Sequence, residues 1–274
     1  MIFPVEDFGG NGPLLHFGHA NGYPPAAYQS FLRPLTQQYR VKAMHWRPLW
    51  PGSEPEALKS WSELSDDFLD WLEAEVSEPV IGAGHSLGAV VTLLAAAKRP
   101  ELFSSLILIE PVFLPPKLLW LLRFFPDFLM QRFHPLIPQT LRRRTQWKST
   151  EEMFASFRQK QVFSEISDKV LREFVEAAVR SVEDGQVELV YSKEWEARIY
   201  ALPPQVWQAL ESLPFPVTGF RATHTDTVLP SAWEHWKQLR PQDRLVEIPD
   251  TTHLVPLETP EALASQVLQF LSEN

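Results

Sequence analysis

The chain of 274 residues contains no cysteine. Disulfide bonds, zinc–thiolate sites, iron–sulfur clusters and thiol nucleophiles are therefore excluded. A chain of this length buries roughly three quarters of its unfolded surface, so it needs no such cross-link to fold. The absence of cysteine also agrees with a reducing compartment, and we expect a cytoplasmic protein.

Basic residues are outnumbered: 25 Lys and Arg stand against 34 Asp and Glu, a net charge of −9. A protein that binds duplex nucleic acid normally presents a basic surface to the phosphates, so we expect no nucleic-acid partner. The charge balance leaves the oligomeric state open.

Long apolar runs are missing as well. The most apolar stretch, residues 115–133, is interrupted by Lys117, Arg123, Pro126 and Asp127. It therefore does not predict a membrane-spanning helix. The N-terminus lacks the basic start and the long apolar core of a signal peptide. Contact with a membrane surface is left open and is not favoured.

Two apolar patterns alternate along residues 13–111. Short apolar runs, typical of buried strands, are separated by segments with helical spacing. We expect strands at 13–19, 39–44, 79–83 and 105–109, and helices at 60–76 and 87–98. This alternation predicts an α/β domain with a mostly parallel sheet covered by helices on both faces.

Residues 112–203 show only helical patterns, including one from Ser167 to Asp184. We expect them to form a helical insertion over one edge of the sheet. The strand and helix alternation then returns, with strands at 216–221 and 245–248. The predicted domain organisation is a core built from residues 1–111 and 204–274 and interrupted by 112–203.

The most specific motif is Gly84-His85-Ser86-Leu87-Gly88, between a predicted strand and a predicted helix. A tight strand-to-helix turn holds the serine in a strained conformation, and the two glycines leave room where side chains would collide. The hydroxyl then stands at the carboxyl edge of the sheet, above the positive end of the helix. This context predicts a nucleophilic Ser86; a plain turn with a serine cap is the alternative.

A serine nucleophile needs a base and a group that orients the base. His253 follows the last predicted strand, so it would lie over the same edge as Ser86. The acid should lie between the two in chain order, and we favour Asp226, which follows the strand at 216–221. Glu110 is the alternative acid, because it directly follows the strand at 105–109.

The developing oxyanion needs backbone donors. One is the N–H of Leu87, which follows the nucleophile. The second is expected in the loop after the first strand, where Gly22 permits a tight bend and places the N–H of Tyr23. An ordinary Asn-Gly turn is the alternative interpretation of this loop.

These segments together resemble the α/β-hydrolase superfamily, in its serine-nucleophile branch with a helical cap. Residues 21–24 (Asn-Gly-Tyr-Pro) match the family's His-Gly-x-Pro loop, with Asn21 in place of the histidine. Residues 84–88 match the nucleophile elbow. Residues 252–256 match the Gly-His-x-x-Pro segment, with Thr252 in place of the glycine. The resemblance covers essentially the whole chain, although the N-terminal hairpin would be shortened and the glycine that often ends the strand before the acid is absent.

The resemblance implies an esterase- or lipase-like hydrolase that uses an acyl-enzyme mechanism, with neither metal nor cofactor. We expect a carboxylesterase that acts on a small apolar acyl or aryl ester. A thioesterase, a lactonase, a carbon–carbon bond hydrolase or an acyltransferase would use the same parts. A ligand receptor with slow turnover is the rival from another class.

The substrate is expected to contact the cap. Residues 111–125 are apolar and aromatic, and side chains of this kind line dry pockets. We expect Phe113 and Trp120 from this segment, together with Asn21 and His85, to border the substrate. The basic run 141–144 is interpreted as a solvated face, and no chemistry is assigned to residues 194–198.

Overall fold

The computed structural model describes residues 3–122, 124 and 134–273. Its centre is a seven-stranded sheet in the order β1-β3-β2-β4-β5-β9-β10. Strand β1 is antiparallel to β3, and the other neighbours are parallel. The strands are β1 (Val5–Gly9), β2 (Leu14–Gly18), β3 (Arg40–Met44), β4 (Val80–His85), β5 (Phe103–Ile109), β9 (Val217–Ala222) and β10 (Arg244–Ile248). The six expected strands are thus confirmed, and β1 adds an antiparallel edge strand beside β3.

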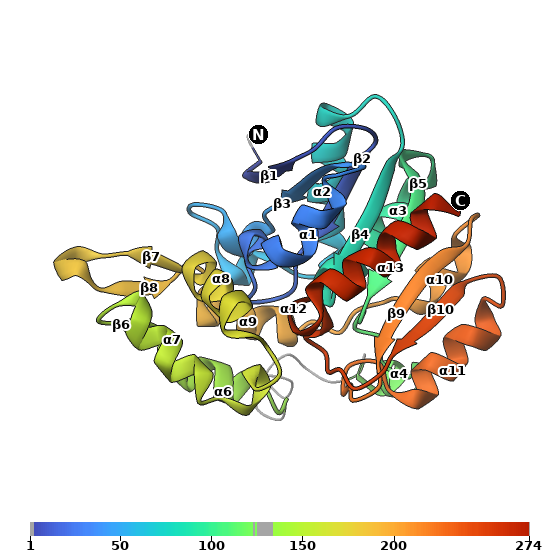
Figure 1. The fold of residues 1–274 in the computed structure, drawn as a ribbon. Helices are drawn as coiled ribbons and strands as arrows, with labels where there is room; N and C mark the ends of the chain where they lie inside the picture. Colours follow the sequence, from blue (N-terminus) through green and yellow to red (C-terminus); the bar gives the residue numbers. More distant parts are fainter. Residues whose placement is uncertain (1–2, 123, 125–133, 274) are drawn as a thin grey trace.

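Helices cover both faces of the sheet (Figure 1). On one face lie α1 (Gln29–Leu35), α12 (Val255–Glu258) and α13 (Pro260–Ser272). The other face carries α2 (Trp61–Glu75), α3 (Leu87–Lys98), α10 (Trp207–Ser212) and α11 (Pro230–Leu239). Successive residues of β5 serve the two faces in turn: Ile107 and Ile109 join the first core, and Leu106 and Leu108 the second. Because both sides are buried, the strand needs a continuous apolar run.

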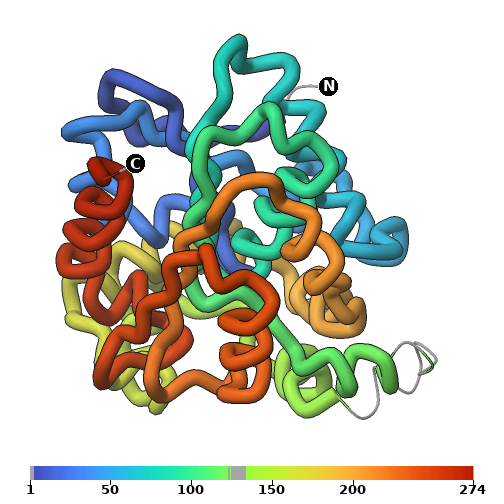
Figure 2. The backbone as a smooth tube through the Cα atoms, turned by 90° about the vertical axis from the view of Figure 1, so that its right-hand side faces the viewer, coloured from blue at the N-terminus to red at the C-terminus, as the bar shows by residue number. Residues whose placement is uncertain are grey.

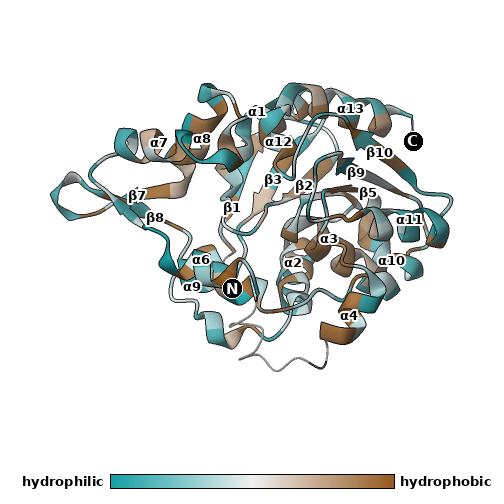
Figure 3. Ribbon diagram, turned by 90° about the horizontal axis from the view of Figure 1, so that it is seen from below, coloured by the Kyte–Doolittle hydropathy of each residue, from teal (hydrophilic) through white to brown (hydrophobic). Residues whose placement is uncertain are grey.

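Helix α3 is the most enclosed helix, and Figure 3 shows it as mostly hydrophobic. Its first turn crosses β2 at backbone contact. A Cβ added to Gly88 would lie 2.0 Å from the Gly18 carbonyl oxygen, and one added to Gly84 would lie 2.5 Å from the Gly88 carbonyl carbon. The glycines of the motif therefore allow α3 to start directly against the sheet.

Replacing Gly88 by alanine is expected to lower the free energy of unfolding by about 3 kcal/mol, because a methyl group would overlap backbone that cannot move aside. Gly52→Ala is the control: φ there is +73° and no atom lies within 4 Å of the added Cβ. Gly52→Ala should lower the free energy of unfolding by only about 1 kcal/mol, the cost of placing a non-glycine residue in the left-handed region. Urea unfolding measures both. Equal stabilities for the two variants would contradict the close crossing.

The described part of the segment between β5 and α10 lies in the lower half of the molecule in Figures 1 and 2, beyond the carboxyl ends of the parallel strands. Its helices are α4 (Pro116–Leu122), α6 (Ile137–Arg142), α7 (Thr150–Arg158), α8 (Asp168–Ala178) and α9 (Lys193–Tyr200). We call this segment the cap. The division into residues 1–111, 112–203 and 204–274 stays a prediction.

The expectation of a purely helical insertion is wrong in one part. The cap also contains a small antiparallel sheet of β6 (Gln146–Trp147), β8 (Val187–Leu189) and β7 (Val179–Ser181), in that order. The helix predicted to reach Asp184 ends at Ala178, and the chain turns back at Asp184 (φ 62°) and Gly185 (φ 75°). An Asp-Gly pair with two positive φ angles is a strong hairpin signal, and here it outweighs the helical spacing.

Within the described part of the chain, no helix is long and apolar enough to cross a membrane. The stretch 115–133 lies only partly within the described residues. Of the residues that interrupt that stretch, Lys117 lies in α4, whereas Arg123, Pro126 and Asp127 fall outside the described residues.

Candidate active site

Ser86 stands at the turn between β4 and α3. Its backbone is strained, with φ 55° and ψ −117°, a region that non-glycine residues rarely occupy. The N–H of Ser86 donates to the Ile109 carbonyl at 3.0 Å, which ties the turn to the end of β5. The elbow expected from the motif is therefore present, and its strain is held by the sheet.

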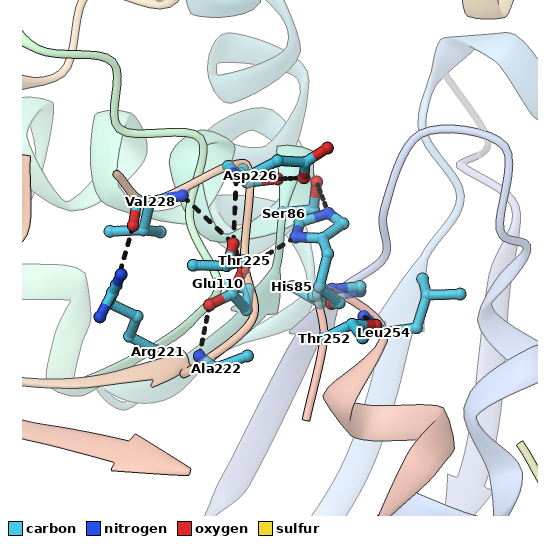
Figure 4. A network of polar contacts seen from close by, with 12 residues as sticks. His85, Ser86, Glu110, Arg221, Ala222, Thr225, Asp226, Val228, Thr252 and Leu254 are labelled. Atoms are coloured by element: carbon cyan, nitrogen blue, oxygen red, sulfur yellow. Dashed lines mark hydrogen bonds and ion pairs between the residues drawn. The ribbon is translucent and has the colours of Figure 1, made fainter. Parts of the chain in front are cut away.

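His253 lies in the loop between β10 and α12, over the same edge of the sheet. Its Nε2 is 3.0 Å from Ser86 Oγ, and its Nδ1 is 3.0 Å from Glu110 Oε2 (Figure 4). A carboxylate oxygen only accepts, so Nδ1 carries the proton and Nε2 presents its lone pair to the serine hydroxyl. This is the arrangement in which a histidine can remove a proton from serine.

Glu110, and not the favoured Asp226, is the carboxylate that faces His253. Its side chain is fully buried at the end of β5. Besides the histidine, it accepts hydrogen bonds from the Ala222 N–H at 2.6 Å and from the Thr225 hydroxyl at 2.5 Å (Figure 4). Three hydrogen-bond donors thus hold this buried carboxylate in place.

The expectation for Asp226 is corrected by the order of the strands. β5 lies between β4 and β9, so a residue at the end of β5 is one strand nearer to Ser86 than a residue that follows β9. Asp226 is in the loop after β9, where its carboxylate accepts a 3.3 Å hydrogen bond from the Thr227 hydroxyl. The residue of that loop that reaches the acid is Thr225.

The two backbone N–H groups expected to bind the oxyanion, those of Leu87 and Tyr23, differ in whether they already have a hydrogen-bond acceptor. Leu87 is the first residue of α3, and the first N–H groups of a helix have no intrahelical acceptor. The N–H of Tyr23 closes a turn by donating to the Ala20 carbonyl at 3.3 Å, which is a long hydrogen bond. Both residues border the cavity described next.

A cavity of about 1100 Å³ opens over Ser86 and His253. Much of its wall is apolar and comes from both the core and the cap, including Trp61, Val112, Leu114, Leu136, Val162 and Ile199. Four acidic residues, Glu165, Asp226, Asp250 and Glu258, also border it. Among the described residues that line this cavity there is no lysine or arginine.

One of the four residues expected to border the substrate does line this cavity, namely Asn21, and three do not. Phe113 is fully buried against Trp207 and Trp236, with ring centroids 5.2 and 4.8 Å away. Trp120 is 62% exposed and borders a separate surface hollow.

The fourth expected residue, His85, is fully buried beneath the elbow. Its ring nitrogens are within hydrogen-bond distance of the Tyr28 hydroxyl and the His253 carbonyl. The expectation that it borders the substrate is therefore corrected.

A partly buried ion pair that sequence reasoning missed lies under the loop of Asn21. Glu196 of α9 is paired with Arg143, and its backbone carbonyl accepts a 3.1 Å hydrogen bond from the Asn21 amide. Burial raises the pKa of Glu196, and the Arg143 guanidinium opposes that rise. A Cβ on Gly22 would lie 3.0 Å from the Glu196 carboxylate. Arg143 is thus not on a solvated face, and nothing in the local pattern signals a partner 53 positions away.

Comparison with known proteins identifies the family. The profile described as "Alpha/beta hydrolase family" matches residues 14–266. The chain belongs to the alpha/beta hydrolase family. The resemblance and the fold expected from the sequence are both confirmed.

Two proteins are similar to this chain in sequence over most of its length. The chain is 26% identical over 239 residues to an abhydrolase domain-containing protein of Alternaria alternata, which covers 73% of this chain and 85% of that protein. It is 23% identical over 263 residues to 2-(acetamidomethylene)succinate hydrolase of Mesorhizobium japonicum, covering 96% and 89% of the two chains.

In structure, the chain is similar to E-2-(acetamidomethylene)succinate hydrolase. The TM-score is 0.82 at 21% identity, and the match covers 98% of this chain and 95% of that one. A likeness at this identity establishes the alpha/beta hydrolase fold, whereas the substrate has to be argued from the cavity.

Proposed function

We propose that this alpha/beta hydrolase is a serine hydrolase that cleaves a carboxylic ester with an apolar acyl or aryl group. The observation that carries the proposal is the chain of contacts from Ser86 Oγ through His253 to Glu110, with both distances 3.0 Å, at the foot of a largely apolar cavity.

In the acylation step, Ser86 Oγ attacks the ester carbonyl while His253 Nε2 takes the hydroxyl proton. Glu110 holds the Nδ1 proton and stabilises the imidazolium that forms. The tetrahedral oxyanion is held by the N–H of Leu87 and by the N–H of Tyr23, which gives up its long contact with Ala20. The C–O bond then breaks, and His253 returns its proton to the leaving alkoxide, which departs as the alcohol.

In the deacylation step, His253 removes a proton from water, and the resulting hydroxide attacks the acyl carbonyl. Collapse of the second tetrahedral intermediate releases the carboxylic acid, and the proton returns to Ser86 Oγ. The proposed steps use neither a metal nor a cofactor.

The acidic residues around the cavity favour a substrate with a neutral acyl group. They disfavour a dicarboxylate such as the succinate derivative in the name of the Mesorhizobium relative. A substrate carboxylate would enter a site bordered by Glu165, Asp226, Asp250 and Glu258, with no lysine or arginine among the described lining residues. Glu258 is half-buried, and like charges repel each other more strongly in such surroundings than in water. The other three carboxylates are exposed and add less, because solvent and salt screen them.

A carbon-matched pair of substrates tests this preference. The p-nitrophenyl ester of hexanoic acid and the mono-p-nitrophenyl ester of adipic acid carry equally long acyl chains, and only the second ends in a carboxylate. We expect kcat/KM to be at least about tenfold higher for hexanoate, a difference of about 1.4 kcal/mol. Along a neutral series from acetate upward, each buried methylene should add at most about fourfold. Preferred hydrolysis of the adipate ester would contradict the proposed substrate class.

A further inference from the structure

The residue before the nucleophile, His85, is fully buried and lies outside the cavity. Its Nε2 is 2.8 Å from the backbone carbonyl oxygen of His253, and its Nδ1 is 2.9 Å from the hydroxyl oxygen of Tyr28. The Tyr28 hydroxyl is in turn 3.3 Å from the backbone nitrogen of Ala20. The serine and the histidine base are thus connected through the backbone as well as through their side chains.

The direction of every hydrogen bond in this series is fixed. A carbonyl oxygen can only accept, so Nε2 of His85 carries a proton and donates it to His253. Burial lowers the pKa of His85 well below its ordinary value, and the neighbouring His253 lowers it further, so the ring is neutral. Nδ1 therefore accepts, and the hydrogen must come from the Tyr28 hydroxyl. Burial raises the pKa of Tyr28, so the hydroxyl keeps that proton.

The direction of the remaining hydrogen bond, between Ala20 and Tyr28, follows from the same assignment of donors and acceptors. The Tyr28 oxygen donates to His85 and accepts from the N–H of Ala20. The series thus runs in one direction, from Ala20 through Tyr28 and His85 to the His253 carbonyl. No donor faces a donor, and no acceptor faces an acceptor.

The series joins three loops that the sequence keeps far apart. Ala20 is in the loop that carries Tyr23, His85 is in the elbow that carries Ser86, and the last carbonyl belongs to the proposed base itself. We propose that Tyr28 and His85 are positioning residues, which hold the oxyanion loop and the His253 loop in register with the elbow. This inference rests on the proposed function, because the register matters through the reaction at Ser86.

Positioning matters because catalysis at this site tolerates only small displacements of His253. The imidazole of His253 must stay 3.0 Å from both Ser86 Oγ and Glu110 Oε2, and the bond from His85 holds the backbone of His253 itself. Hydrogen bonds are stronger inside a protein than in water because the local dielectric is low. A displacement of about 1 Å at a reacting group can cost roughly a hundredfold in rate.

Tyr28→Phe removes one oxygen atom and two links of the series. Tyr39→Phe is the matched control, because Tyr39 belongs to the same hydrophobic core and lies outside the series. We expect Tyr28→Phe to lower kcat and the second-order rate of fluorophosphonate labelling by about tenfold or more, with KM changed by less than about twofold. Tyr39→Phe should keep all three values.

Two variants of His85 distinguish its hydrogen bond to the His253 carbonyl from its hydrogen bond with Tyr28. Glutamine can place an amide N–H near Nε2 and so retain the donor to the His253 carbonyl. Asparagine can place an oxygen near Nδ1 and so retain only the acceptor for Tyr28. We expect His85→Gln to label at least about fivefold faster than His85→Asn, because the link to His253 acts on the base directly. If Tyr28→Phe and His85→Asn lose thermal stability but label as fast as the wild type, the two residues are structural and the inference is overturned.

A readout independent of activity separates this inference from the proposed function. In protein with ¹⁵N-labelled histidine, His85 should give the spectrum of a neutral ring protonated at Nε2, and Tyr28→Phe should shift its Nδ1 resonance. A wild type that shows this spectrum but neither labels nor hydrolyses esters would end the proposed function and leave the hydrogen-bond series standing. A His85 protonated at Nδ1 would overturn the series itself.

Discussion

Replacing Ser86 by alanine is expected to lower kcat for ester hydrolysis by at least about three orders of magnitude. The hydroxyl of Ser86 is the group that His253 Nε2 contacts at 3.0 Å, and alanine leaves the base with nothing to activate. The rate should be measured on p-nitrophenyl hexanoate at saturation, so that a change in binding is not mistaken for a change in chemistry.

The control for this variant is a serine away from the cavity. Ser265 lies exposed on α13, where its hydroxyl donates to the Glu261 carbonyl, and Ser265→Ala should keep the wild-type rate. Thermal unfolding of both variants shows whether they fold. A folded Ser86→Ala protein that retains more than a tenth of the wild-type kcat would exclude Ser86 as the nucleophile.

Glu110→Gln is expected to lower kcat by about three orders of magnitude, although it keeps the shape of the side chain. Both oxygens of Glu110 accept hydrogen bonds, one from the Ala222 N–H and the other from His253 Nδ1 and the Thr225 hydroxyl. An amide has only one oxygen, so either orientation sets an N–H donor against another donor. The variant should also unfold more easily, by about 1–3 kcal/mol.

The matched variant is Asp226→Asn, which makes the same chemical change on the neighbouring loop. Asp226 contacts only the Thr227 hydroxyl among the hydrogen bonds described, at 3.3 Å, and we expect its rate to change by less than about fivefold. Measured side by side, the two variants assign the acid. A larger loss for Asp226→Asn than for Glu110→Gln would reverse the assignment.

Much of the core could be predicted from the sequence, because its strands and helices carry strong and consistent patterns. The strand at 105–109 is apolar at every position that reaches the middle of the sheet, and the observed β5 ends at Ile109 as expected. The cap was harder to predict. The strands flanking Asp184 are three residues long and half exposed, so their alternation is too short to compete with a helical spacing that continues through Val179.

The site shows a similar division. Ser86 and His253 were predicted correctly as neighbours, because each follows a strand that ends at the same edge of the sheet. The choice between Asp226 and Glu110 depended on the spatial order of β5 and β9 beside β4, and the order along the chain does not fix it.

The lining of the cavity could not be predicted from apolar character alone. Val112 and Leu114 border the cavity, while Phe113 between them turns into the core against Trp236. Which side of an irregular segment faces the cavity depends on the backbone path after β5. Only the fold supplies that path.

The central claim is that Ser86 is an activated nucleophile, and labelling with a fluorophosphonate probe tests it most directly. Wild-type protein and Ser86→Ala would be treated alike, weighed intact and digested to locate the adduct. We predict a single adduct on the wild type, on the peptide that contains Ser86, and none on the variant. An adduct that persists in Ser86→Ala, or a folded wild type that takes up no probe, would contradict the account.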